Sequence, residues 1–134
     1  LDKNNLGSDI FNSAYLNIVL IWNKGIAFGL LSFDESHLYN ILTLLISIIV
    51  VILVIMSLKS QGFKKYSLLM IVGGALGNLH DRIFYNAVPD FIDLHFYDLH
   101  WFVFNVADIF ITVGVFCLIL VELFFNNKNI NEKN

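Results

Sequence analysis

The stretch LYNILTLLISIIVVILVIMSL, from Leu38 to Leu58, decides the class of this protein. Its 21 residues carry no charge, and the next residue, Lys59, ends the run. A helix of about 20 apolar residues crosses the roughly 30 Å hydrocarbon layer of a membrane. The sequence therefore predicts a transmembrane helix here.

The composition of the 134-residue chain agrees with a membrane protein. Hydrophobic residues make up 57% and charged residues 14%, against about 25% charged in soluble domains. A soluble domain of this size cannot bury so much apolar surface. The net charge of −3 without a basic run argues against nucleic acid as a partner, and one cysteine excludes an internal disulfide. We expect a single integral-membrane domain over residues 1–134.

Two further membrane spans are predicted, over Phe63–Phe84 and Trp101–Val121. The uncharged part of the first, Tyr66–Leu79, is short, but the lysines before it can extend to the membrane surface. The second contains a single charge, Asp108, before Glu122 follows it. The predicted fold is thus an all-α polytopic membrane protein with three visible spans.

The basic residues predict the orientation of these spans, because cytoplasmic loops are rich in lysine and arginine. Five lysines share one side in this topology: Lys59, Lys64, Lys65, Lys128 and Lys133. The N-terminal segment and the connection from His80 to His100 then lie outside. An external N-terminus without a signal peptide suggests that a fourth, N-terminal span is missing from a fragment that starts at Leu1.

The two outer segments differ in character. Leu16 to Trp22 is rich in β-branched residues, Asn23-Lys24-Gly25 is a turn signal, and IAFGLL follows. This pattern predicts a β-hairpin or small curved sheet on the membrane surface. The stretch VPDFIDLHFYDLHW mixes aromatic residues with Asp and His, which is typical of a segment in the headgroup layer.

Asp108 is the most informative single residue, because it is placed about two turns inside the third predicted span. A carboxylate there costs roughly 2.5–3.5 kcal/mol on insertion scales and usually faces the protein interior. Asn105 precedes it by three residues and is predicted to share its helix face. Asp108 is either a functional acid or a polar contact between helices.

Asp90 is the second candidate acid. It follows Pro89 and lies at the same predicted membrane level as Asp108. Two neighbouring carboxylates cannot both ionise easily, so one can take a proton from water while the other hydrogen-bonds a substrate carbonyl. Taken alone, Asp90 could instead be a solvated loop residue, and Asp93 and Asp98 are expected to be solvated or hydrogen-bonded.

The run GGALGNLHDR combines small and polar residues. Gly73 and Gly77 form a G-x-x-x-G pair, which permits close helix packing. Asn78, Asp81 and Arg82 are then predicted to lie on one helix face at the outer end of the span. Arg82 departs from the positive-inside pattern. An ion pair with a carboxylate or a lipid phosphate would explain it, as would capping of the helix C-terminus.

Other classes of function find less support. His80, His95 and His100 match no standard metal-site spacing, so no metal or other cofactor is expected. Cys117 is interpreted as a small packing residue. An ion-coupled transporter or membrane scaffold remains an alternative, although the polar candidates gather at one predicted membrane face. An intramembrane protease of another class would need a Ser/His pair or an H-E-x-x-H motif.

Taken together, four short runs resemble the lipoprotein signal peptidase (signal peptidase II) family. They are NKGIAF (Asn23–Phe28), GGALGNLHDR (Gly73–Arg82), VPDF (Val88–Phe91) and FNVAD (Phe104–Asp108). Their order and spacing also match, and the resemblance extends from about Tyr15 to Glu122. The family's first span, which commonly ends in a D-Q-x-x-K stretch, is not seen.

The resemblance implies a bacterial inner-membrane aspartic peptidase with four spans, whose active site lies at the extracytoplasmic face. A β-cradle would follow the first span, and an extracytoplasmic helical segment would precede the last. The catalytic dyad would be Asp90 and Asp108. Positions that would bind substrate or support the site are Asn23, Gly25, Asn78, Asp81, Arg82 and Asn105. A monomer among membrane lipids would cut a prolipoprotein just before its lipidated cysteine.

Overall fold

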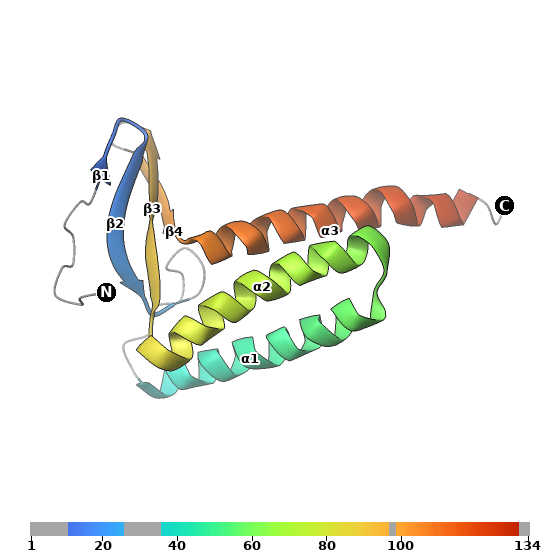
Figure 1. Ribbon diagram of the computed structural model, residues 1–134, viewed down its shortest axis with the longest axis horizontal. Coiled ribbons are helices and arrows are strands. Elements are labelled where there is room, and N and C mark those ends of the chain that lie inside the picture. The colour runs from blue at the N-terminus through green and yellow to red at the C-terminus, as the bar shows by residue number, and fades with distance from the viewer. Residues whose placement is uncertain (1–10, 26–35, 97–98, 132–134) are drawn as a thin grey trace. The chain divides into compact units, whose positions relative to one another are not determined.

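The computed structural model describes residues 11–25, 36–96 and 99–131. Their elements follow the order β1, β2, α1, α2, β3, β4 and α3 (Figure 1). They divide into two compact units. The first combines Leu1–Leu44 with Asn78–Val106, and the second combines Leu45–Gly77 with Ala107–Asn134.

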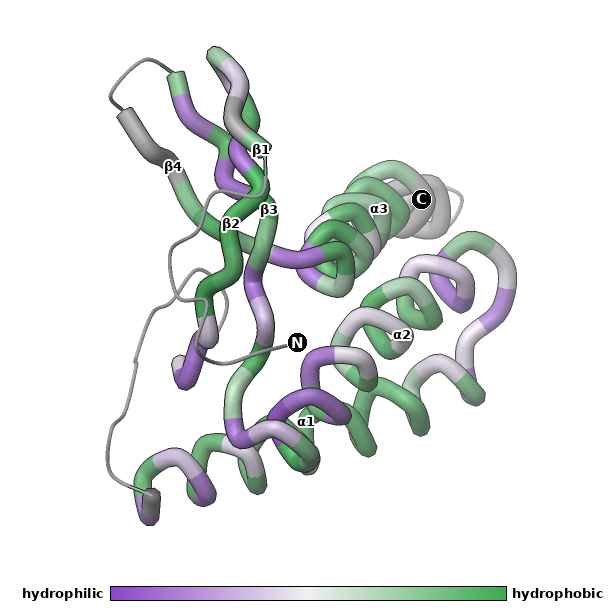
Figure 2. The backbone as a smooth tube through the Cα atoms, turned by 60° about the vertical axis from the view of Figure 1, so that its left-hand side comes forward, coloured by the Kyte–Doolittle hydropathy of each residue, from purple (hydrophilic) through white to green (hydrophobic). Residues whose placement is uncertain are grey.

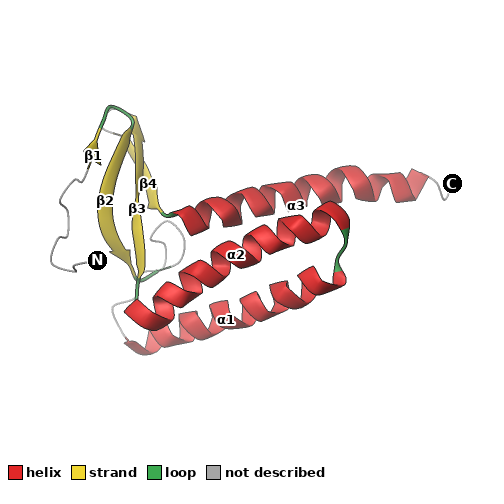
Figure 3. Cartoon of the chain, in the orientation of Figure 1, coloured by secondary structure: helices red, strands yellow, loops and turns green. Residues whose placement is uncertain are grey.

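The first unit contains a four-stranded antiparallel sheet in the order β1-β2-β3-β4. The strands are β1 (Phe11–Asn12), β2 (Leu16–Asn23), β3 (Val88–Phe96) and β4 (Leu99–Phe104), drawn in yellow in Figure 3. β2 confirms the strand predicted at Leu16–Trp22. The IAFGLL run, predicted to continue a hairpin, lies outside the described residues.

The stretch from Val88 was predicted to be a segment in the headgroup layer, and the resemblance implied a helical segment before the last span. The implied helical segment is wrong, because β3 and β4 pair as a hairpin there, whereas the position in the headgroup layer stays a prediction. β3 also pairs with β2, so β3 hydrogen-bonds on both sides. Aromatic and β-branched residues favour such a strand, and Pro89 is tolerated because it stands at the second position of β3.

The described residues also form three long helices: α1 (Ser36–Lys59), α2 (Gly62–Tyr85) and α3 (Val106–Asn131). Within the described part of the chain, two segments are long and apolar enough to cross a membrane, His37–Lys59 and Val106–Phe124. Figure 2 colours most of α1 and α3 as hydrophobic. Many of their large apolar side chains are exposed, as expected where lipid covers a helix. The predicted span over α2 stays a prediction.

The third predicted span begins later than expected. Trp101 to Phe104 belong to β4, and α3 starts only at Val106. Asp108 therefore lies in the first turn of α3, not two turns inside a helix. Asn105 precedes the helix and occupies its N-cap position. The apolar run did not reveal this boundary because aromatic residues suit the end of a strand as well as the start of a span.

Within the second unit, α2 and α3 contact closely at two glycines. A Cβ on Gly74 would lie 2.4 Å from the carbonyl oxygen of Ala107, and one on Gly114 would lie 2.7 Å from Cγ1 of Ile71. The predicted G-x-x-x-G pair is not this contact. A Cβ on Gly73 meets nothing within 4 Å among the described residues, and one on Gly77 makes an ordinary contact with Ala107.

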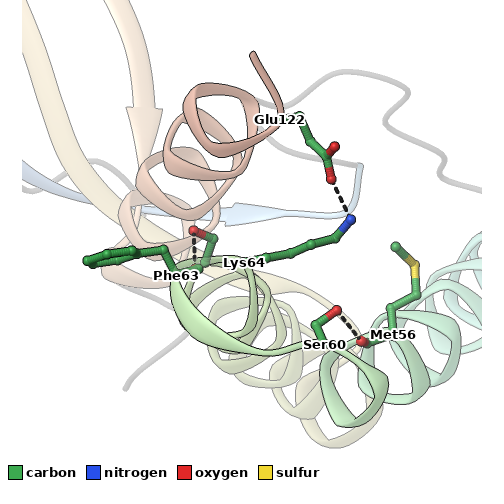
Figure 4. A network of polar contacts seen from close by, with 6 residues as sticks. Met56, Ser60, Phe63, Lys64 and Glu122 are labelled. Carbon is green, nitrogen blue, oxygen red and sulfur yellow. Dashed lines mark hydrogen bonds and ion pairs between the residues drawn. The ribbon is translucent and has the colours of Figure 1, made fainter. Parts of the chain in front are cut away.

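Further polar contacts in the second unit involve the end of α1, the start of α2 and the residue Glu122 of α3 (Figure 4). Lys64 of α2 donates to the carboxylate of Glu122 on α3, and both side chains are partly exposed. Ser60, the residue after α1, donates through its hydroxyl to the carbonyl of Met56 in the last turn of that helix. Exposed ion pairs contribute little stability, so the glycine contacts are the more important for α2–α3 packing.

We predict that Gly74→Ala destabilises the protein, while Gly73→Ala does not. The added methyl at position 74 meets a backbone carbonyl that cannot move alone, and overpacking typically costs 1–3 kcal/mol. The methyl at position 73 has space, and alanine favours a helix over glycine. Thermal unfolding in detergent measures both. Equal melting temperatures for the two variants would contradict the assigned contact.

Candidate active site

The carboxylate of Asp90 is the centre of a buried hydrogen-bond network in the first unit. Asp90 is 2% exposed on β3. Its Oδ2 accepts from Nδ2 of Asn23 at 2.9 Å, and its Oδ1 accepts from Nδ2 of Asn105 at 2.8 Å. Donors to both oxygens favour the ionised carboxylate over the acid, and they compensate for its burial.

The two amides reach Asp90 from separate parts of the chain. Asn23 ends β2, and the β2–β3 register places it opposite Val88, two residues before Asp90. Asn105 is the one residue between β4 and α3. Its Nδ2 also donates to Oδ1 of Asn78 on α2, at 3.1 Å. The amide group of Asn105 thus uses both of its N–H bonds, one toward the carboxylate and one toward α2.

A second branch of the network runs from Asn23 to α2. The backbone N–H of Gly25 donates to Oδ1 of Asn23 at 2.7 Å, which confirms a turn at Asn23-Lys24-Gly25. Nη2 of Arg82 donates to the carbonyl of Gly25. Arg82 is 4% exposed, and its guanidinium carbon lies 6.0 Å from the ring centre of Tyr39. The Tyr39 hydroxyl donates to the Arg82 carbonyl at 3.3 Å.

The first unit thus brings together most of the residues that the sequence singled out: Asn23, Gly25, Asn78, Arg82, Asp90 and Asn105. Asp81 bonds instead to its neighbour, with Oδ1 at 3.2 Å from Nδ1 of His80. Among the described hydrogen bonds of the Arg82 side chain, the acceptor is a backbone carbonyl, and the contact with a lipid phosphate stays a prediction.

Asp108 belongs to the second unit, where it is 6% exposed. The first turn of a helix carries partial positive charge from its free N–H groups, so a carboxylate is favourable there. Along the chain it stands three residues after Asn105, the residue that donates to Asp90.

Sequence reasoning did not locate the burial of two acids and one tyrosine in this region. Asp93 was expected to be solvated or hydrogen-bonded, and its 4% exposure on β3 excludes only the solvated alternative. Asp90 is buried on the same strand and is not a solvated loop acid. Tyr39 was not considered at all, since it stands inside the apolar run that defines the first span. Within the described parts of the chain, no three His, Cys, Asp or Glu residues are grouped as metal ligands.

We predict that Asn105→Leu lowers the stability of the protein by about 1–3 kcal/mol, because it leaves one oxygen of a buried carboxylate without its amide donor. Adding Asp90→Asn in the same chain should recover part of the loss, since a neutral amide is easier to bury than a carboxylate. Thermal unfolding of the two single variants and the double variant measures this. A double variant at least as unstable as the sum of the singles would contradict it.

Comparisons with known proteins show the family of this chain. Residues 2–125 match the family described as "Signal peptidase (SPase) II". The chain is 64% identical over 126 residues to a protein of Pelagibacter ubique named lipoprotein signal peptidase, covering 94% of this chain and 76% of that one. It is 45% identical over 116 residues to a protein of the same name from Anaplasma phagocytophilum, covering 86% and 74%.

Solved structures described as bacterial membrane enzymes have a similar fold. One has a TM-score of 0.70 at 29% identity and covers 96% of this chain and 76% of its own. Another has a TM-score of 0.69 at 32% identity, with 89% and 77% covered. With the two apolar helices long enough to span a bilayer, these likenesses support a membrane protein.

Proposed function

Since the chain belongs to the signal peptidase II family of aspartic peptidases, we propose that it removes the signal peptide from diacylglyceryl-modified prolipoproteins by cutting before the lipidated cysteine. The relatives named above are lipoprotein signal peptidases, which supports this substrate class. The observation that carries the proposal is the buried carboxylate of Asp90 with an amide donor on each oxygen.

The proposed mechanism uses Asp90 and Asp108 as a dyad that activates water. A carboxylate has about four acceptor sites on its two oxygens, so the two amides leave Asp90 able to accept a water proton. Because donors favour its ionised form, we assign Asp90 the role of general base. Asp108 would then hold the shared proton at rest and donate it in a hydrogen bond to the substrate carbonyl.

The proposed steps conserve atoms and charge. Water attacks the carbonyl carbon of the scissile peptide bond, and its proton passes to Asp90. The carbonyl oxygen takes the proton of Asp108, giving a neutral tetrahedral intermediate. Its collapse breaks the C–N bond, a proton from Asp90 passes to the leaving nitrogen, and a hydroxyl proton of the intermediate returns to Asp108. No covalent enzyme intermediate forms. Arg82 and the three asparagines would hold or contact the substrate backbone around this bond.

The proposed location follows from the lipid on the substrate. Acyl chains hold the substrate in the bilayer, so its cleavage point lies at a membrane surface. The substrate then reaches the enzyme by two-dimensional diffusion in the membrane. Exposed apolar side chains on α1 and α3 are suited to contact lipid and acyl chains. From the distribution of lysines we place the site at the extracytoplasmic face of a bacterial inner membrane. We expect the enzyme to act as a monomer.

We predict that Asp90→Asn and Asp108→Asn each lower the cleavage rate by about 10²–10⁴-fold, the usual contribution of a general acid or base. Asp93→Asn is the matched control, since Asp93 is equally buried on the same strand and undergoes the same substitution. A gel-shift assay with diacylglyceryl-modified prolipoprotein and the detergent-purified chain measures cleavage. If Asp93→Asn is as inactive as Asp90→Asn, the chosen pair of acids is wrong.

A folded parent chain that leaves this substrate intact would overturn the proposed function itself. The transporter or scaffold interpretation would then become the first to test, by measuring proton flux in vesicles.

We also predict that cleavage continues in EDTA and after treatment with serine and cysteine reagents. The proposed mechanism needs two carboxylates and water, and Cys117 has no part in it. The same gel-shift assay, run with each reagent beside an untreated sample, measures this. Abolition of activity by EDTA, with recovery on adding a divalent cation, would exclude the proposed chemistry.

A further inference from the structure

Tyr39 makes two contacts to one residue of α2. It lies in the first turn of α1 and is 6% exposed. Its hydroxyl donates to the backbone carbonyl of Arg82, and its ring lies 6.0 Å from the Arg82 guanidinium carbon. That distance is at the limit of a cation–π contact. Tyr39 therefore contacts both the backbone and the charged group of Arg82.

The contacted carbonyl lies in the last turn of α2, where helices leave carbonyl groups free. It also accepts from the N–H of Asn86 at 3.1 Å. Asn86 has a φ of 55°, the left-handed conformation that commonly ends a helix and that asparagine tolerates. The end of α2, and with it the starting point of the Arg82 side chain, is therefore held by the local cap and by Tyr39.

From this position Arg82 holds the turn after β2. Its Nη2 donates to the Gly25 carbonyl, and the Gly25 N–H donates to Oδ1 of Asn23. An asparagine amide has one acceptor end and one donor end. With Oδ1 engaged by Gly25, Nδ2 faces the Oδ2 atom of Asp90. A reversed amide would place oxygen against a carboxylate oxygen, which is repulsive.

From these contacts we infer that Tyr39 is a positioning residue for Asp90, acting through Arg82, Gly25 and Asn23. The inference rests on the proposed function, because it concerns the same carboxylate. Tyr39 touches neither the carboxylate nor the amide that donates to it. It keeps the turn in the arrangement in which Asn23 presents an N–H group to Asp90.

The test is the steady-state kinetics of Tyr39→Phe, which keeps the ring and removes the hydroxyl. The free energy of one lost hydrogen bond corresponds to a reduction of kcat by about three- to tenfold. We expect kcat to fall by this factor while KM stays within about twofold, since substrate contacts are kept. Tyr66→Phe is the control, because Tyr66 is 67% exposed on α2. It should retain parental kinetics.

A second comparison tests whether Tyr39 acts on Asp90 through Asn23. In an Asn23→Ala chain the turn no longer has an amide to orient, so adding Tyr39→Phe should lower kcat no further. If Tyr39→Phe lowers kcat by the same factor in the Asn23→Ala chain, the effect of Tyr39 through Asn23 is overturned. A Tyr39→Phe enzyme with parental kcat per folded molecule, even with a lower melting temperature, or one in which only KM rises, would overturn that effect too.

Arg82 supplies a further check by conservative rescue. Arg82→Lys keeps a donor that can reach the Gly25 carbonyl, whereas Arg82→Met does not. The lysine variant should retain a higher kcat than the methionine variant, and equal losses would contradict a role through Gly25. Failure of the proposed function is recognised separately, because then the parent chain leaves prolipoprotein uncut. If the parent cuts and Asp90→Asn does not, an unaffected Tyr39→Phe overturns this inference alone.

Discussion

The burial of the Asp90 carboxylate is the constraint on which the first unit depends. A carboxylate removed from water is costly unless hydrogen bonds replace its hydration, and here one amide donates to each oxygen. Supplying those amides requires the end of β2 and the residue between β4 and α3 to meet around β3. The sheet is therefore part of the site, because without its register the donors would have no common position.

The hydrogen bonds to Asp90 also connect elements far apart in the chain. Asn105 links the carboxylate to Asn78 on α2, and Asn23 links it through Gly25 to Arg82, also on α2. Asn78 and Arg82 stand four residues apart, one helical turn, so one face of α2 supports both sides of the carboxylate. The motif GGALGNLHDR thus has two roles. Its Gly74 allows α3 to approach within the second unit, and its polar end supports Asp90.

Much of this fold and site could be predicted from the sequence, and the errors share a physical cause. The run from Leu38 to Leu58 identifies a span because length and lack of charge are local properties. The pairing of β3 with β2 is not local, since Val88 and its partner Asn23 are separated by two long helices. Apolar and aromatic residues before Asn105 suit either a strand or a span, so the start of α3 could not be located.

The residues proposed for the site were found through short motifs, whereas their burial was not predicted. Asp90 and Asp93 stand among polar and aromatic neighbours typical of a membrane surface, and only the tertiary arrangement buries them. Tyr39 could not be found by pattern, because a tyrosine near the end of an apolar run normally indicates the membrane interface. Its contact with Arg82 depends on the place where α2 ends.

The amides that donate to Asp90 have one more consequence, which concerns the medium around the protein. Asparagine carries no net charge, so its hydrogen bonds are short-range dipolar contacts rather than ion pairs. Mobile ions screen charges over about 8–10 Å at physiological ionic strength, but they do not enter a buried contact of this length. This part of the carboxylate's stabilisation is therefore independent of the salt concentration.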